Sequence, residues 1–172
     1  MSIDFYDFSI GICLKRLAVL KSLIQKGGEF AEAKGFNQAN LLNSRLAPNM
    51  LALSNQVQIA CDMSKGAVFR LTGTEAPKFA DDETTFEQLI DRIDRTVAYV
   101  TSVDRSAFDG SEDKMVDFKA GPMELTLKGS DYVTQLVLPN VFFHVTTAYN
   151  ILRHNGVELG KFDFLGVDPS KL

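Results

Sequence analysis

The chain has 172 residues, of which 45% are hydrophobic and 23% charged, a composition typical of globular proteins and unlike disordered or fibrous ones. This length fits one domain of ordinary size, so we expect a single domain over residues 1–172. The formal net charge is −4 and the cations are scattered singly among acids, which disfavours nucleic acid as a partner.

No segment has the pattern of a signal peptide or a membrane helix. Asp4 and Asp7 stand where a signal peptide carries positive charge, and no apolar run approaches about 20 residues. Cys13 and Cys61 fit no zinc motif and lie in apolar stripes, which favours buried free thiols over a disulfide. We therefore expect a cytoplasmic protein without a membrane partner.

The first half of the chain predicts two amphipathic helices. Apolar residues at steps of three and four predict one over residues 5–25, with a break or kink at Gly27-Gly28 and a further short helical stretch over 29–34. Pro48 suits the first turn of a second helix that extends to Leu71. Its apolar seam is nearly heptad, as in an antiparallel bundle: Met50, Leu53, Val57, Cys61, Ser64, Val68 and Leu71.

Three apolar residues of the second helix lie off this seam, namely Ile59, Met63 and Phe69. A helix that is apolar beyond one stripe is either central or buried at a subunit contact. We therefore expect a homodimer.

The third helix has a clear start signal after a loop over residues 74–83. Thr84-x-x-Glu87 has the pattern of a capping box, and an apolar stripe follows it as far as Val100. Asp91 and Arg95 form an i,i+4 pair on the outer side.

The apolar period then changes from helical to alternating. Residues 115–119 and 123–128 alternate around Ala120-Gly121-Pro122, which predicts a β-hairpin. Ser130 or Asp131 is expected to cap a fourth helix that stops at Gly156, with a kink or short break at Pro139. The tail after it is expected to pack back for part of its length. The sequence thus predicts an all-α four-helix bundle with a small β-hairpin before the last helix.

Standard catalytic signatures are missing from the sequence, and it holds two histidines. His144 falls on the apolar stripe of the fourth helix and points into the bundle. It is either a core histidine bonded to a neighbouring helix or a base or metal ligand in a cavity. His154 lies about 15 Å further along the helix, too far to share a metal ion with His144.

We name five residues as a candidate pocket: His144, Asn140, Tyr149, Gln58 and Asp62. Asn140 and Tyr149 are candidates for lining a cavity at His144. Gln58 and Asp62 form an i,i+4 polar pair well off the apolar stripe, which favours a solvated or dimer-rim position over a metal site.

Five sequence blocks together resemble a bacterial family of unknown function in the DinB/YfiT-like superfamily of four-helix bundles. They are RLAPNM (45–50), QVQIACD (56–62), LPN (138–140), FHVTTAY (143–149) and ILRHNGVE (151–158). The resemblance spans almost the whole chain. It implies the DinB-like fold and a relationship to metalloenzymes.

The metal-binding members of that superfamily use one histidine from helix two and an H-x₃-H pair from helix four. Here His144 matches one of that pair, Ala148 stands four residues on, and residues 48–71 contain no histidine. The resemblance therefore carries over neither the three-histidine site nor a thiol-transferase activity, and we expect no cofactor. We predict a non-enzymatic or binding homodimer with a degenerate metal site. The alternative is a small-molecule-binding protein or metal-dependent enzyme with a site centred on His144.

Overall fold

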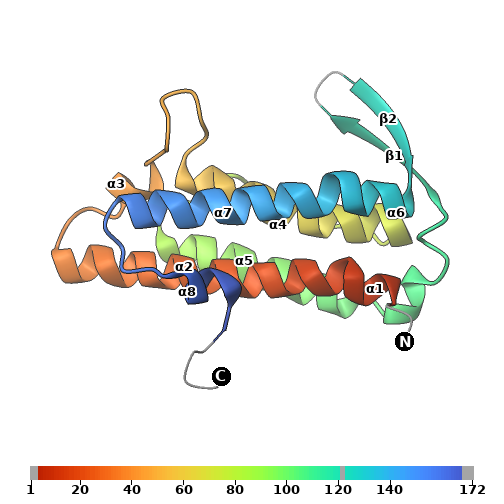
Figure 1. Cartoon of the computed structure of the whole chain (residues 1–172), viewed down its shortest axis with the longest axis horizontal. Coiled ribbons are helices and arrows are strands. Elements are labelled where there is room, and N and C mark those ends of the chain that lie inside the picture. The colour runs from red at the N-terminus through yellow and green to blue at the C-terminus, as the bar shows by residue number, and fades with distance from the viewer. Residues whose placement is uncertain (1–3, 121–122, 168–172) are drawn as a thin grey trace.

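Four long helices form the body of the molecule in the computed structural model, which describes residues 4–120 and 123–167. They are α2 (Ile10–Lys34), α4 (Leu53–Thr72), α5 (Phe86–Ser102) and α7 (Leu138–His154). α2 and α4 each pack against both α5 and α7 (Figure 1). The prediction of a four-helix bundle with a hairpin before the last long helix is confirmed.

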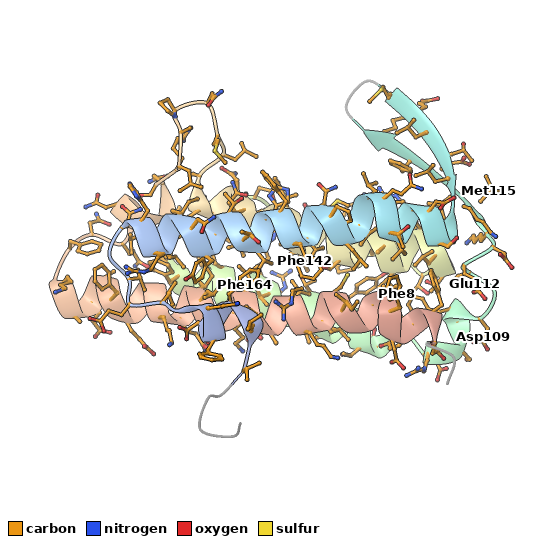
Figure 2. All side chains as sticks on the ribbon, in the orientation of Figure 1. Phe8, Asp109, Glu112, Met115, Phe142 and Phe164 are labelled. Carbon is orange, nitrogen blue, oxygen red and sulfur yellow. The ribbon has the colours of Figure 1, made fainter. Side chains whose placement is uncertain are left out.

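Six short helical elements connect or flank these helices. They are α1 (Phe5–Phe8), α3 (Ala39–Leu42), η1 (Arg105–Phe108), α6 (Gly129–Asp131), η2 (Tyr132–Val137) and α8 (Lys161–Leu165). α8 folds back onto α2, where Lys26 pairs with Asp163 at 2.6 Å and Arg16 donates to the Phe164 carbonyl at 2.9 Å. Arg16 also lies over the rings of Phe142 and Phe164, which face the same side of the molecule (Figure 2). The tail therefore packs back for part of its length as predicted, through residues 163–165.

One continuous hydrophobic core fills the space between the long helices. Cys13 and Cys61 are buried in it as free thiols, as predicted, and burial raises the pKa of each to about 12. None of the described helices is both long and apolar enough to cross a membrane.

The predicted break at Gly27-Gly28 is wrong, because α2 continues through both glycines to Lys34. A Cβ on Gly27 would lie 2.9 Å from the Phe86 ring and 2.8 Å from Leu152. The glycine therefore lets α5 and α7 approach the α2 backbone closely. The helix ends instead at Gly35, whose φ of 68° is left-handed.

The predicted start of the second helix at Pro48 is also wrong. α4 begins at Leu53, whose amide donates to the Ser44 carbonyl at 2.9 Å and closes a loop that projects from the bundle (Figure 1). Pro48 lies in a turn of this loop, between Ala47 and Met50. The off-seam residues of α4 differ in exposure: Phe69 is exposed, whereas Ile59 and Met63 are half-buried.

The capping box of α5 is formed one residue later than predicted. Gln88 donates its amide to Thr85 Oγ1 at 3.2 Å, and its own side chain accepts from the Thr85 amide at 3.1 Å. Thr85 is therefore the N-cap rather than Thr84. The predicted outer pair of Asp91 and Arg95 is present at 3.5 Å.

The predicted hairpin is confirmed as the antiparallel pair β1 (Met115–Ala120) and β2 (Met123–Lys128). Its predicted turn residues Gly121 and Pro122 lie outside the described residues. Val116 and Phe118 are buried, and the Phe118 ring packs against Tyr132 at 5.3 Å. The base of the hairpin is thus part of the core.

The last long helix begins without the predicted cap at Ser130 or Asp131. Helical structure starts at Gly129, where a Cβ would collide with the Ser111 carbonyl. The π-helical turns of η2 then lead into Pro139, which has no amide hydrogen to donate. These wide turns, rather than a break, accommodate the proline.

Candidate functional site

A buried hydrogen bond joins α4 to α7 at the centre of the predicted pocket. His144 Nδ1 lies 2.7 Å from Gln56 Oε1, and the two residues are 7% and 1% exposed. Both side chains come from inward-facing positions, since Val57, Ala60, Val145 and Ala148 beside them are also buried. This contact matches the first of the two alternatives for His144, a core histidine bonded to a neighbouring helix.

The orientation of the Gln56 amide fixes the tautomer of His144. Gln56 Nε2 donates to the Leu51 carbonyl at 2.9 Å, so the amide oxygen is the atom that faces the imidazole. Nδ1 must then carry the hydrogen, which leaves a lone pair on Nε2. Burial lowers the pKa of His144 below 6.5 and favours this neutral form.

Asn140 and Tyr149 lie on α7 but do not hydrogen-bond to His144. The Asn140 amide donates to the Leu136 carbonyl of the same helical stretch at 2.8 Å. The Tyr149 ring packs edge-on against Phe164 of α8. Of the three predicted pocket residues on α7, His144 is therefore the one that takes part in the buried hydrogen bond to α4.

Gln58 and Asp62 bond to the segment before α5 and to α5 itself, and not to α7. Gln58 Nε2 donates to Glu83 Oε2 at 2.8 Å, and Asp62 accepts from Arg92 Nη2 at 2.9 Å. Gln56 and Gln58 are two positions apart, about 200° on a helical wheel. The structure thus places His144 on one side of α4 and Gln58 with Asp62 on another, while Asn140 and Tyr149 bond or pack elsewhere.

Arg92, which binds Asp62, is a site residue that is not among the five candidates named from the sequence. It is 1% exposed and contacts the carboxylates of Asp62, Asp81 and Glu83 at 2.8–2.9 Å. Its position three residues after Leu89 and four before Thr96, both buried, is the sequence signal that places it on the inner face.

Arg92 and the carboxylates of Asp62, Asp81 and Glu83, which we call the Arg92 cluster, stabilise one another's charges. Burial alone would raise the pKa of Glu83, but hydrogen bonds from Arg92 and Gln58 outweigh burial and hold that pKa below its ordinary value. Burial would likewise lower the pKa of Arg92, whereas the hydrogen bond to Glu83 and the charge of Asp62 raise it. Both groups are therefore ionised at neutral pH.

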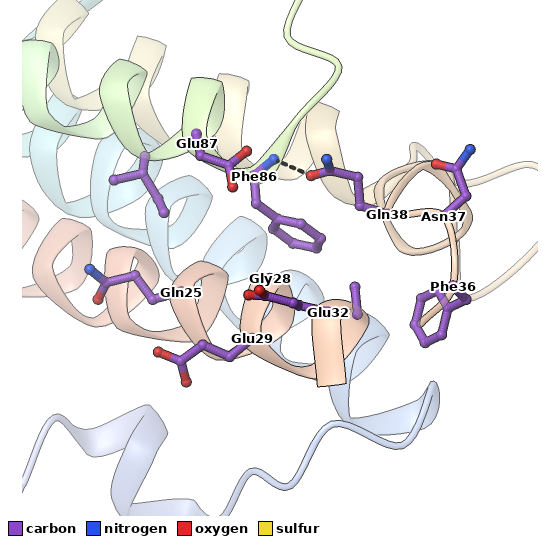
Figure 3. A pocket seen from close by; sticks show the side chains of 11 residues that line it. Gln25, Gly28, Glu29, Glu32, Phe36, Asn37, Gln38, Phe86 and Glu87 are labelled. Carbon is purple, nitrogen blue, oxygen red and sulfur yellow. Dashed lines mark hydrogen bonds between the residues drawn. The ribbon is translucent and has the colours of Figure 1, made fainter. Parts of the chain in front are cut away.

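A separate groove of about 620 Å³ lies between α2, α5 and the segment before α3 (Figure 3). The Phe86 ring forms part of its wall, and the Phe86 amide donates to Gln38 Oε1 at 2.9 Å. Glu29, Glu32 and Glu87 lie on its rim and are exposed. None of the residues predicted for the pocket lines this groove.

The residues present do not fit a three-histidine metal site. The resemblance implies that α4 and α7 are the helices that would supply such ligands, and α4 presents Gln56 to His144. Ala148 has no donor atom. Within residues 4–120 and 123–167, no three His, Cys, Asp or Glu side chains are grouped so that they could hold a metal ion.

Comparison with known proteins agrees with this fold. A family model described as "Domain of unknown function (DUF1993)" matches residues 5–165. The chain is similar to the crystal structure of a DinB family member protein from Shewanella denitrificans, with 40% sequence identity and a TM-score of 0.87. That similarity covers 95% of this chain and 93% of the other. No curated protein matches the chain.

Proposed function

This chain belongs to the DUF1993 family and is DinB-like, and we propose that it is a non-enzymatic binding protein that acts as a homodimer. The hydrogen bond between Gln56 and His144 carries the proposal. It engages the inward imidazole on the helix pair that supplies metal ligands in metal-binding relatives. Gln58 bonds to Glu83 and Asp62 bonds to Arg92, so neither side chain faces His144 as a partner for acid–base or metal chemistry.

One face of the β1–β2 hairpin is apolar and extends from the core into solvent, which supports the homodimer. Phe118 pairs with Leu125 across the hairpin, and Met123 follows on the same face. Phe118 is buried against the bundle, whereas Leu125 and Met123 are 37% and 57% exposed on a hairpin that stands clear of the helices (Figure 1). A second copy that covers this face would form a two-fold symmetric contact.

The contact needs more apolar surface than the hairpin tip alone, because a stable interface buries about 800 Å² on each partner. We propose that Phe69, near the C-terminal end of α4, supplies part of it. There Lys114, just before β1, donates to the Leu71 carbonyl at 3.3 Å, which places the C-terminal end of α4 beside the hairpin. Phe69 is 45% exposed.

Light scattering on the purified protein tests the homodimer. We expect twice the chain mass of 19.0 kDa at micromolar concentration, and a shift to 19.0 kDa in Leu125→Lys. Thr126→Lys is the matched control, because Thr126 lies on the opposite sheet face and should leave the dimer intact. A wild-type mass of 19.0 kDa throughout the micromolar range would show the homodimer to be wrong.

A second candidate function is a small-molecule or metal-dependent site centred on His144. The free lone pair of His144 Nε2 favours it, since no described residue hydrogen-bonds to that atom. Elemental analysis of protein purified without chelators tests it. Near-stoichiometric zinc or nickel that is lost in His144→Ala would favour this candidate and contradict the non-enzymatic proposal.

A further inference from the structure

The segment between α4 and α5, residues 74–84, lies against these helices through side-chain contacts and not through backbone–backbone hydrogen bonds. We call it the strap. None of its amides or carbonyls takes part in a backbone–backbone hydrogen bond with the described residues. Outside its ends, side-chain contacts to α4 and α5 hold it in place. Such a segment detaches more easily than one that is paired along its backbone.

Arg92 makes three of the polar contacts that hold the strap, and Gln58 of α4 makes another by donating to Glu83. Arg92 Nη1 lies 2.8 Å from Glu83 Oε1, 2.9 Å from Asp81 Oδ1 and 3.1 Å from the Ala80 carbonyl oxygen. Its Nη2 is bound to Asp62 of α4. One buried arginine therefore receives two carboxylates and a carbonyl from three residues of the strap within residues 80–83.

The Phe79 ring of the strap lies among three cations. Lys65 Nζ is 4.2 Å from the ring centroid, and the guanidinium carbons of Arg95 and Arg92 are 4.4 Å and 5.3 Å away. Lys65 also pairs with Asp62, and Arg95 with Asp91. Cations over an aromatic face attract it, so the ring is recognised by charge as well as by burial.

The strap thus presents an aromatic ring and two carboxylates at two-residue steps, Phe79-x-Asp81-x-Glu83, to a set of cations on two rigid helices. The strap leaves one hydrogen-bond donor of these cations without a partner among the described residues. Arg92 Nε is buried and has no hydrogen-bond partner among the described residues. Carboxylates bind arginine best as a two-pronged pair, and a carboxylate that reached Nε together with a second nitrogen would satisfy this donor.

We propose that Lys65, Arg92 and Arg95 form a recognition site for an acidic peptide segment that contains an aromatic residue, and that the strap fills this site as an internal ligand. The site lies on α4 and α5, apart from His144, and does not depend on the homodimer. A tethered ligand acts at an effective concentration in the millimolar range, so an outside segment binds well only when the strap is released.

The test uses a fluorescein-labelled peptide with the sequence of residues 74–85 and measures its fluorescence anisotropy against the full chain. The released-strap variant combines Phe79→Ser, Asp81→Asn and Glu83→Gln. We expect it to bind the peptide at least tenfold more tightly than the wild type. Asp82→Asn is the matched control, because Asp82 is exposed and makes no hydrogen bond or ion pair in the described structure, and it should behave like the wild type.

Two further variants, one of the protein and one of the peptide, test which groups make the contact. Adding Lys65→Gln and Arg95→Gln to the released-strap variant should weaken binding at least fivefold, and so should replacing the peptide's phenylalanine by alanine. The proposal is overturned if the folded released-strap variant binds no more tightly than the wild type. It is also overturned if binding is unchanged by the loss of both cations or of the ring.

A measurement on the wild-type chain covers the case in which the released-strap variant does not fold. Lys78 is exposed, but a protease must bind the flanking residues as an extended segment, so we expect trypsin to cleave after Lys78 faster when the strap leaves the helices. An excess of unlabelled peptide whose lysine is replaced by glutamine should raise the cleavage rate at Lys78 severalfold, and a scrambled peptide should not. Equal cleavage rates with the two peptides would overturn the proposal.

Discussion

Gln56 Oε1 accepts a hydrogen bond from His144 Nδ1 at 2.7 Å, and this contact determines what the helix pair α4–α7 presents to a ligand. Because the Gln56 amide also donates to the Leu51 carbonyl, its oxygen cannot turn away without losing two bonds. The imidazole is held neutral with one lone pair free. One lone pair makes a hydrogen-bond acceptor, whereas a stable zinc site needs three or four ligands.

Gln56→Leu should lower the free energy of unfolding by about 1–3 kcal/mol, because it leaves the buried Nδ1–H of His144 without an acceptor. Urea denaturation gives this difference. The double variant Gln56→Leu/His144→Leu should recover part of the loss, since replacing both partners by apolar groups removes the unpaired donor. Strictly additive losses in the two single variants and the double variant would contradict a coupled pair.

The stability of the protein should fall as the pH drops below about 6.5 because His144 resists protonation in the folded state. Its pKa is lowered by burial, so in this range the unfolded chain binds more protons and unfolding becomes easier. Urea midpoints at pH 7.5 and 5.5 measure the effect. His144→Asn keeps a donor toward Gln56 but does not titrate, and it should lose less stability than the wild type. Parallel changes in the two proteins would argue against a role for His144.

The four long helices could be predicted because each repeats apolar residues at helical spacing. The residues at which these helices begin and end were harder to predict. Gly27 looks like a helix breaker in sequence, and only the packed Phe86 and Leu152 show why a glycine is required inside α2. Pro48 fits a helix start equally well as a loop turn, and the closing bond from Leu53 to Ser44 joins residues whose pairing no local pattern specifies.

The candidate site, like the helix boundaries, could be predicted only in part from the sequence. The inward direction of His144 followed from its helical position, but its partner was not predictable. Gln56 and Gln58 lie on the same helix with the same chemistry, and only the packing of α4 between α5 and α7 decides which one meets the imidazole. Arg92 was overlooked because a cation at the spacing of an apolar stripe is buried only where carboxylates from other segments reach it.

Two glycines inside long helices should respond to alanine in opposite ways. Gly27→Ala forces its new methyl group against Phe86 and Leu152, and such overpacking costs about 1–3 kcal/mol. Gly66 of α4 is half-buried, and its Cβ would meet only the guanidinium end of Arg70, which can move. Gly66→Ala should therefore stabilise the protein by about 0.5–1 kcal/mol. The unfolding temperatures of the two variants test both predictions. A stabilised Gly27→Ala would contradict the close approach of Phe86 and Leu152 to the α2 backbone.

The start of α5 should depend on Thr85 far more than on Thr84. Thr85 Oγ1 accepts from the Gln88 amide, which otherwise has no partner within the helix, so Thr85→Ala should cost about 1 kcal/mol. The hydroxyl of Thr84 contacts only the Gln88 side chain, at 3.1 Å, and the Thr84 backbone amide keeps its bond to that side chain in any variant. Thr84→Ala should cost a few tenths of that, about 0.3 kcal/mol. Urea denaturation of both variants under one set of conditions gives the comparison. Equal losses would mean that the two threonines share the cap, and a larger loss in Thr84→Ala would place the N-cap one residue earlier.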